Sequence, residues 1–208
     1  MMRIIDGKEV YTELEEVVRP PHTALLVVDL QGDYEKEHGA SGVLKSLPPV
    51  LAAARHAGVM VIYTRNTYLP HHRSLAPAQL RRLLKSGYDP GTQLAYHLDS
   101  SFREVVSSVA PAQSERVIDK MRGSAFVGTE LEVVFRSNGI RTIVLCGKAT
   151  DQCVMATLWD ALGKDYYTVV LTDCVSSNRP AGHEAALEQM KTISDIALGA
   201  DLISIWSK

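Results

Sequence analysis

Thr23-Ala-Leu-Leu-Val-Val-Asp29 is the stretch that decides the fold, because six uncharged residues lead directly into a carboxylate. Two further runs, Val59–Thr64 and Thr142–Gly147, have the same continuous apolar character. Strands that are apolar on both faces are typical of a parallel sheet covered by helices. We therefore expect these three runs to be buried parallel strands.

Segments of helical periodicity separate these strands. Leu44–Ala57 is rich in alanine, has apolar residues about 3.6 positions apart, and is followed by Gly58, a typical helix stop. Strands that alternate with helices predict right-handed crossovers, and hence an α/β fold. We expect a three-layer α-β-α arrangement with a Rossmann-like parallel sheet of about six strands, in a single domain covering residues 1–208. The other predicted helices are Pro77–Lys85, Thr129–Asn138, Cys153–Gly163 and His183–Lys191, and the other predicted strands are Arg116–Asp119, Tyr166–Asp173 and Ala200–Trp206.

The connection over residues 66–93 is long for a compact domain, and it contains Pro70, Pro77 and Pro90. Connections of this length usually serve a function. We expect it to act as a lid or a specificity loop.

Composition and charge exclude several classes of protein. Of 208 residues, 46% are hydrophobic and 22% charged, which is ordinary for a globular protein. The formal net charge is −2, and no large Lys/Arg cluster is present, which argues against a nucleic-acid partner or an anionic membrane surface. The longest apolar runs are about five residues, whereas a bilayer crossing needs about 20, and no secretory signal precedes them. We therefore expect a soluble, cytoplasmic protein.

Three cysteines, Cys146, Cys153 and Cys174, are an odd number and form no C-x-x-C pair. This pattern disfavours both a disulfide framework and a zinc knuckle. The three thiols are expected to be free, so any one of them is a candidate nucleophile.

Reactive side chains follow three of the predicted strands. Asp29 ends the first strand, Lys120 follows Arg116–Asp119, and Cys153 stands after the turn that begins at Gly147. Because ligands of an α/β sheet bind at the carboxyl ends of its strands, we expect these three side chains to meet there. Each residue also has an ordinary structural explanation: a turn cap, a solvated strand end or small core filler. The presence of all three side chains at one edge of the sheet favours a catalytic site over these structural explanations.

The three side chains form a usable reaction set. A thiol reacts as the thiolate, and its pKa falls at a helix N-terminus and beside a cation such as Lys120. Asp29 would accept the thiol proton and return it to a leaving amine. The turn before Cys153 offers backbone N–H groups to an oxyanion. This set predicts acyl transfer through a thioester, followed by attack of water.

The chain resembles the isochorismatase-like cysteine hydrolases over nearly its whole length. The resemblance is carried by Asp29-Leu-Gln-Gly-Asp-Tyr34, by Lys120-Met-Arg-Gly-Ser-Ala-Phe-Val-Gly-Thr-Glu-Leu131 and by Gly147-Lys-Ala-Thr-Asp-Gln-Cys153. It implies that Asp29, Lys120 and Cys153 are catalytic. It also implies a cis peptide at Lys148–Ala149, with the N–H groups of Ala149 and Cys153 forming the oxyanion hole.

The second motif is similar to the branch that contains N-carbamoylsarcosine, maleamate, biuret and ureidoacrylate amidohydrolases. The resemblance therefore implies hydrolysis of a C–N bond in a small linear amide or ureide, with release of ammonia. Isochorismatase-type or nicotinamidase-type hydrolysis on the same site is the alternative, and a non-catalytic binding protein on this fold is another. Family members usually form homodimers or homotetramers, so such an assembly is expected.

Four residues are candidates for binding the substrate. Arg179 matches an arginine that holds a substrate carboxylate in carbamoylsarcosine amidohydrolase, and Arg65 ends the second strand at the same edge. A guanidinium group suits a carboxylate, so the substrate is expected to carry one. Gln31 and Asn66 are expected to bind an amide or to shape turns.

We expect the protein to use no metal and no cofactor. Nicotinamidases carry metal ligands after the second strand, where this chain has Thr64-Arg65-Asn66-Thr67. His71 and His72 follow, but adjacent histidines are poorly placed to share one ion. The chain also lacks the glycine-rich phosphate-binding motifs.

Overall fold

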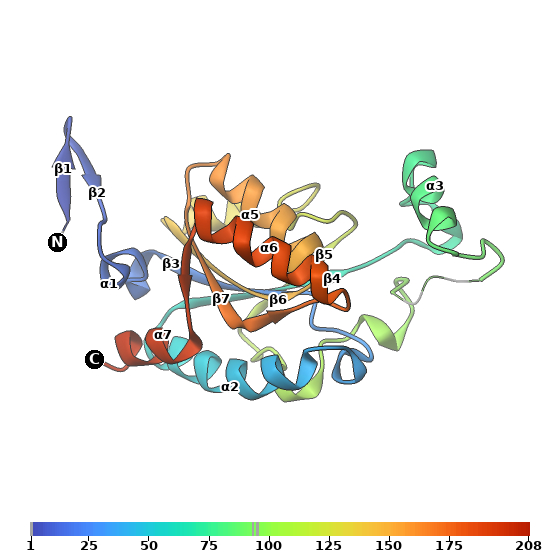
Figure 1. Ribbon diagram of the computed structural model, residues 1–208, viewed down its shortest axis with the longest axis horizontal. Coiled ribbons are helices and arrows are strands. Elements are labelled where there is room, and N and C mark those ends of the chain that lie inside the picture. Colours follow the sequence, from blue (N-terminus) through green and yellow to red (C-terminus); the bar gives the residue numbers. More distant parts are fainter. Residues whose placement is uncertain (1, 93, 95) are drawn as a thin grey trace.

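A parallel sheet forms the centre of the molecule (Figure 1). The computed structural model describes residues 2–92, 94 and 96–208. In this part of the chain six strands pair in the order β5-β4-β3-β6-β7-β8, and every neighbouring pair is parallel. The predicted α/β class is thereby confirmed. The strands are β3 (Thr23–Val28), β4 (Met60–Asn66), β5 (Arg116–Lys120), β6 (Thr142–Lys148), β7 (Tyr167–Ser176) and β8 (Asp195–Ala197).

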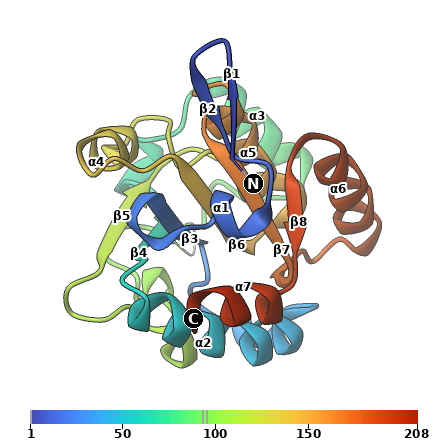
Figure 2. The same ribbon diagram turned by 90° about the vertical axis from the view of Figure 1, so that its left-hand side faces the viewer.

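Helices cover both faces of the sheet and complete three layers (Figures 1 and 2). One face packs against α2 (Ala40–His56) and α7 (Gly199–Trp206). The opposite face packs against α4 (Leu131–Ser137), α5 (Met155–Leu162) and α6 (Pro180–Ile193).

The central strand β3 shows why the sheet must be covered on both sides. All six of its residues are buried. Leu25 and Val27 join the core beneath α2, whereas Leu26 and Val28 join the core beneath α5. Burying a Leu or Val side chain stabilises the fold by about 1.5–3 kcal/mol, so a strand with apolar side chains in both cores is stable only between two layers of helices.

The predicted last strand, Ala200–Trp206, is wrong. These residues lie in α7, and the last strand is the three-residue β8 that precedes it. Asp201 stabilises the helix start, because its Oδ2 accepts a hydrogen bond of 2.8 Å from the Leu198 N–H. Trp206 is buried, and its Nε1 donates to the Val18 carbonyl at 2.9 Å.

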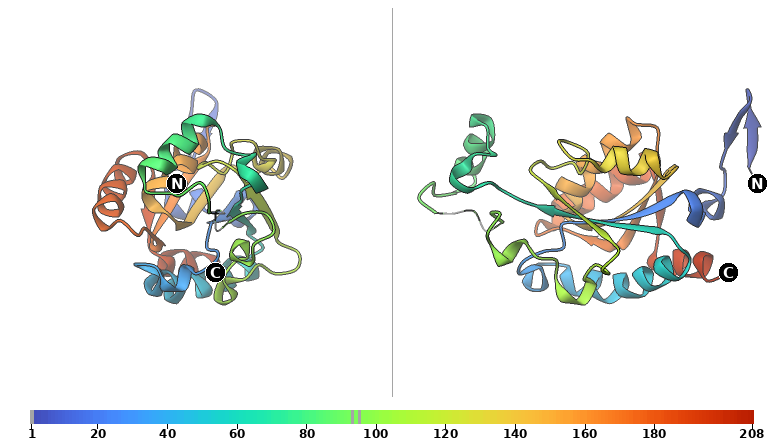
Figure 3. Two further views of the ribbon diagram at one scale, coloured as in Figure 1. Left: turned by 90° about the vertical axis from the view of Figure 1, so that its right-hand side faces the viewer. Right: turned by 180° about the vertical axis from the view of Figure 1, so that it is seen from behind.

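Two segments stand away from the layers, at opposite ends of the molecule (Figure 3). At one end, an antiparallel hairpin is formed by β1 (Arg3–Ile5) and β2 (Lys8–Val10), and the short helix α1 (Leu14–Val17) follows it. At the other end, the 66–93 connection carries α3 (Pro77–Lys85), a helix with no buried residue. The bounds predicted for this helix are confirmed. Within the described residues, no helix is long and apolar enough to span a membrane.

Candidate active site

Asp29 follows the last residue of β3, at the carboxyl edge of the sheet. Its backbone has φ of 52°, an uncommon conformation for a residue with a side chain. The Asp29 N–H donates to the Thr64 carbonyl at 3.1 Å, and the Thr64 hydroxyl donates to Asp29 Oδ1 at 2.8 Å. Neighbouring strand β4 thus holds both the backbone and the carboxylate of Asp29 in place. Such strained, over-determined residues often lie at functional sites.

Lys120 is the last residue of β5, and its side chain is fully buried. Its Nζ lies 2.7 Å from Asp29 Oδ2 and 3.3 Å from Cys153 Sγ. It also donates to the carbonyl of Arg122 at 3.0 Å. The structure therefore brings the three predicted catalytic residues into direct contact, with the lysine between the carboxylate and the thiol.

Cys153 lies inside a π-helical turn, η6 (Thr150–Val154), and not at the first residue of an α-helix as predicted. The α-helix proper, α5, begins at Met155. π-Helical turns occur frequently at functional sites. This turn places the thiol beside Lys120 and in the wall of a pocket.

Charge and burial act on the thiol in the direction opposite to the predicted one. Burial raises the pKa of Cys153, the neighbouring Asp29 carboxylate raises it further, and Lys120 opposes both, so that the pKa is about 12. Burial by itself would lower the pKa of Lys120, but the negative charges of Asp29 and Cys153 outweigh it and raise that pKa. The resting site therefore holds a protonated thiol beside an Asp29–Lys120 ion pair.

The turn before Cys153 contains a cis peptide between Lys148 and Ala149, as the resemblance implies. Strand β6 reaches this turn through Gly147, whose φ is 112°. A Cβ atom at Gly147 would lie 2.1 Å from the carbonyl oxygen of Val28, so only glycine allows β6 to pass this close to β3. Ala149 and Cys153, the two residues predicted to supply the oxyanion hole, both line the pocket.

This pocket, here called the first pocket, has a volume of about 360 Å³. Gln31, Asn66 and Arg179 line it together with Asp29 and Cys153. The Gln31 and Asn66 pair is tied together, because Gln31 accepts from the Asn66 N–H at 2.6 Å and donates to the Asn66 carbonyl at 3.0 Å. Three of the four predicted substrate-binding residues therefore reach the pocket.

Arg65 is the fourth, and the structure does not bring it to the pocket. Its guanidinium group forms ion pairs with Asp119 at 2.9 Å and with Glu104 at 3.0 Å. Along β4 successive side chains alternate between the two faces of the sheet, so Asn66 and Arg65 cannot both face the thiol. Arg65 thus belongs to a surface ion-pair group beside the site.

One wall of the first pocket is polar, and the sequence analysis did not predict its contacts. Lys148 Nζ forms an ion pair with Glu37, and Asn178 Nδ2 donates to the other Glu37 oxygen at 3.0 Å. All three side chains line the pocket. They come from three distant parts of the chain, and no spacing in the sequence signals their meeting.

The start of α6 and the residues just before it hold the η6 turn, a contact that the sequence analysis also missed. Ser177 donates to Asp151 Oδ1 at 2.8 Å, and Arg179 forms an ion pair with Asp151 Oδ2 at 2.7 Å. Thr150 Oγ1 lies within hydrogen-bond distance, 2.8 Å, of His183 Nδ1. The turn that carries Cys153 is therefore fixed from the side of α6 as well as from β6.

Comparisons with known proteins match this chain over most of its length. A family model for the isochorismatase domain matches residues 23–205. A ureidoacrylate amidohydrolase of Methylorubrum extorquens is 31% identical over 211 residues, covering 84% of this chain and 80% of that protein. Among solved structures, a cysteine hydrolase from Pseudomonas syringae superimposes with a TM-score of 0.82 at 22% identity, covering 92% of this chain and 95% of that one. An N-carbamoylsarcosine amidase from Thermoplasma acidophilum gives 0.70 at 24% identity, covering 85% and 96%. The two structures share the fold described above.

Proposed function

The chain belongs to the isochorismatase family of hydrolases, and on this premise we propose that it hydrolyses a C–N bond of a small linear amide or ureide through a cysteine thioester. The observation that carries the proposal is the contact of Lys120 Nζ with both Asp29 and Cys153, at 2.7 and 3.3 Å, in the wall of the first pocket. A carboxylate, an ammonium and a thiol in this arrangement suit nucleophilic acyl transfer.

The high pKa of the resting thiol requires proton transfer to accompany attack. As Cys153 Sγ forms a bond to the substrate carbonyl carbon, its proton passes to Asp29. The carbonyl oxygen gains negative charge, which the Ala149 and Cys153 N–H groups and the Lys120 ammonium stabilise. Asp29 then returns the proton to the nitrogen and the C–N bond breaks. Ammonia leaves, and the acyl group remains bound to Cys153 Sγ as a thioester.

Water completes the reaction. Asp29, ionised again, takes a proton from a water molecule that attacks the thioester carbon. The C–S bond breaks, the acid product leaves, and the proton returns to Cys153. The cycle needs no oxidant or reductant, and every proton is accounted for.

We also propose that the substrate carries a carboxylate and that the active protein is a homodimer or homotetramer. The relative from Methylorubrum extorquens supports the first point, since ureidoacrylate contains both a ureide and a carboxylate.

Ammonia release tests the reaction. Wild-type protein and Cys153→Ala are compared on a panel of ureides, linear amides and nicotinamide. We expect release from at least one ureide or amide of an acid, and a fall of more than about 1,000-fold in Cys153→Ala, because the nucleophile is lost.

The matched control is Cys146→Ala, which removes a thiol that is buried in β6 and outside the first pocket. This variant should keep its activity, and thermal unfolding should show that both variants are folded. Undiminished turnover by folded Cys153→Ala would end the thioester mechanism.

A further inference from the structure

Cys153 lies between two pockets. The second, here called the α3 pocket, has a volume of about 320 Å³ and shares Asn66, Gln152 and Cys153 with the first pocket. Its outer wall comes from α3, through Gln79 and Arg82. A substrate whose amide lies at the thiol therefore has two directions in which to extend.

The cations of the first pocket are already neutralised. Lys148 is paired with Glu37, and Arg179 is paired with Asp151, whose carboxylate also accepts a hydrogen bond from Ser177. A substrate carboxylate on either cation would compete with a carboxylate of the protein itself. The first pocket is thus electrically balanced without a ligand.

The cations of the α3 pocket differ in this respect. Within residues 2–92, 94 and 96–208, neither Arg82 nor Arg122 forms an ion pair with a carboxylate. The one acidic side chain among the described residues of this pocket is Asp151, which Arg179 already engages. Two uncompensated guanidinium groups therefore face one cavity beside the thiol.

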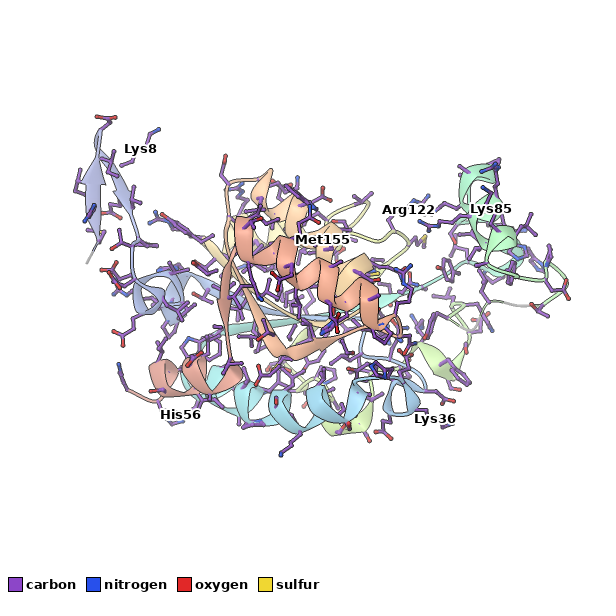
Figure 4. All side chains as sticks on the ribbon, viewed as in Figure 1. Lys8, Lys36, His56, Lys85, Arg122 and Met155 are labelled. Carbon is purple, nitrogen blue, oxygen red and sulfur yellow. The ribbon has the colours of Figure 1, made fainter. Side chains whose placement is uncertain are left out.

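Arg122 is also firmly placed. Its half-buried side chain donates through Nη1 to the Ser74 carbonyl at 3.0 Å and to the Met121 carbonyl at 2.6 Å. Its own carbonyl accepts the hydrogen bond from Lys120 Nζ. Figure 4 shows Arg122 on the side of the body that faces α3, where Lys85 marks the helix end. Arg122 is thus fixed at both ends, by two carbonyl groups at its guanidinium group and by Lys120 at its backbone.

We propose that the α3 pocket binds the carboxylate of an acidic substrate, with Arg122 and Arg82 as its partners. This rests on the proposed function, and it assigns the substrate class as a ureido or amido acid that extends past Cys153 toward α3. Guanidinium groups suit this role because they form charge-assisted, bidentate hydrogen bonds to a carboxylate. In this arrangement Arg179 positions the η6 turn and does not hold the substrate.

Binding to Cys153→Ala tests the proposal without requiring turnover. The probes are 3-ureidopropionate and propylurea, which share a ureide and a chain length but differ in the carboxylate. Calorimetry should show that 3-ureidopropionate binds more tightly than propylurea. Adding Arg82→Gln to Cys153→Ala should reduce the ratio of the two affinities by about 10- to 100-fold. The matched control is Arg81→Gln, since Arg81 is the neighbouring cation on α3 and does not line the pocket.

Arg122→Lys is the second variant, because it keeps the charge but loses the fork. It should partly reduce the ratio of the affinities for the two probes, and thermal unfolding should confirm that the variant is folded. Equal affinity for the two probes, including no measurable binding of either, would overturn the proposal, as would loss of the preference in Arg179→Gln alone. Failure of the proposed function is separate, since it appears as ammonia release that does not depend on Cys153.

Discussion

The Cys153 thiol is held in its protonated form by its surroundings. Burial and the Asp29 carboxylate raise its pKa, and the single cation beside it, Lys120, does not compensate. A protonated resting thiol resists oxidation and chance alkylation, because the thiolate is the reactive species. In the proposed mechanism, the thiolate is then generated only when a substrate occupies the site and Asp29 accepts the proton.

Asp29→Asn should separate thiol acidity from catalysis. Because the Asp29 charge raises the pKa of Cys153, its removal should lower that pKa and speed alkylation by iodoacetamide at pH 8. Amide turnover should nevertheless fall by about 100- to 10,000-fold, since the proton acceptor is lost. Measured together, the two rates should move in opposite directions.

A suitable control is Asp33→Asn, which removes an exposed carboxylate paired with Lys36 on the surface. Neither rate should change in this variant. Slower alkylation of Asp29→Asn than of wild type would mean that Asp29 already withdraws the thiol proton in the resting enzyme.

At the scale of elements, the strands buried on both faces of the sheet were predictable from the sequence. Continuous apolar runs identified β3 and β6 because a strand buried on both faces has few polar positions. The predicted strand over Ala200–Trp206 failed because its apolar residues also suit a short helix, in which Leu202 and Trp206, four positions apart, are buried on one side. Its true state depends on partners far away, such as Val18, which accepts the Trp206 hydrogen bond.

The contact between α6 and η6 makes a prediction about one glycine. A Cβ atom at Gly182, in the first turn of α6, would lie 2.2 Å from Asp151 Oδ2. Gly182→Ala should therefore displace the Asp151 carboxylate and shift the turn that carries Cys153. We expect kcat to fall by roughly 100-fold, since displacements of about 1 Å have effects of this size. Steady-state kinetics on the ureide identified by the ammonia assay checks this value.

Gly42→Ala is the matched control for this substitution. Gly42 also lies in a helix, α2, but a Cβ atom there would meet nothing within 4 Å. Alanine favours a helix over glycine by about 1 kcal/mol, so this variant should be at least as stable as wild type and fully active. Wild-type kcat in Gly182→Ala would show that the α6 contact does not position the nucleophile.

For the whole molecule, the sequence predicted which three side chains meet at the edge of the sheet, but not the charges around them. Asp29, Lys120 and Cys153 could be found because each lies at the end of a strand or in the turn after it, and parallel strands end at one edge of the sheet. The pairing of Arg179 with Asp151 could not be predicted, because it depends on how α6 and η6 are oriented. Arg65 failed as a pocket residue for the same reason, since side-chain direction within a strand is not set by where the strand ends.

The two projecting ends of the molecule favour the predicted assembly. Ile4 and Ile5 of the hairpin are 63% and 52% exposed, and Leu84 of α3 is 52% exposed. A lone two-stranded hairpin is marginally stable in water, so contact with a second copy would stabilise it. Light scattering should therefore give two or four times the 22.8 kDa of one chain. Replacing both Ile4 and Ile5 by Asp should lower the mass, whereas Lys8→Gln on the same hairpin should not. A mass of one chain for the wild type at all concentrations would contradict the assembly.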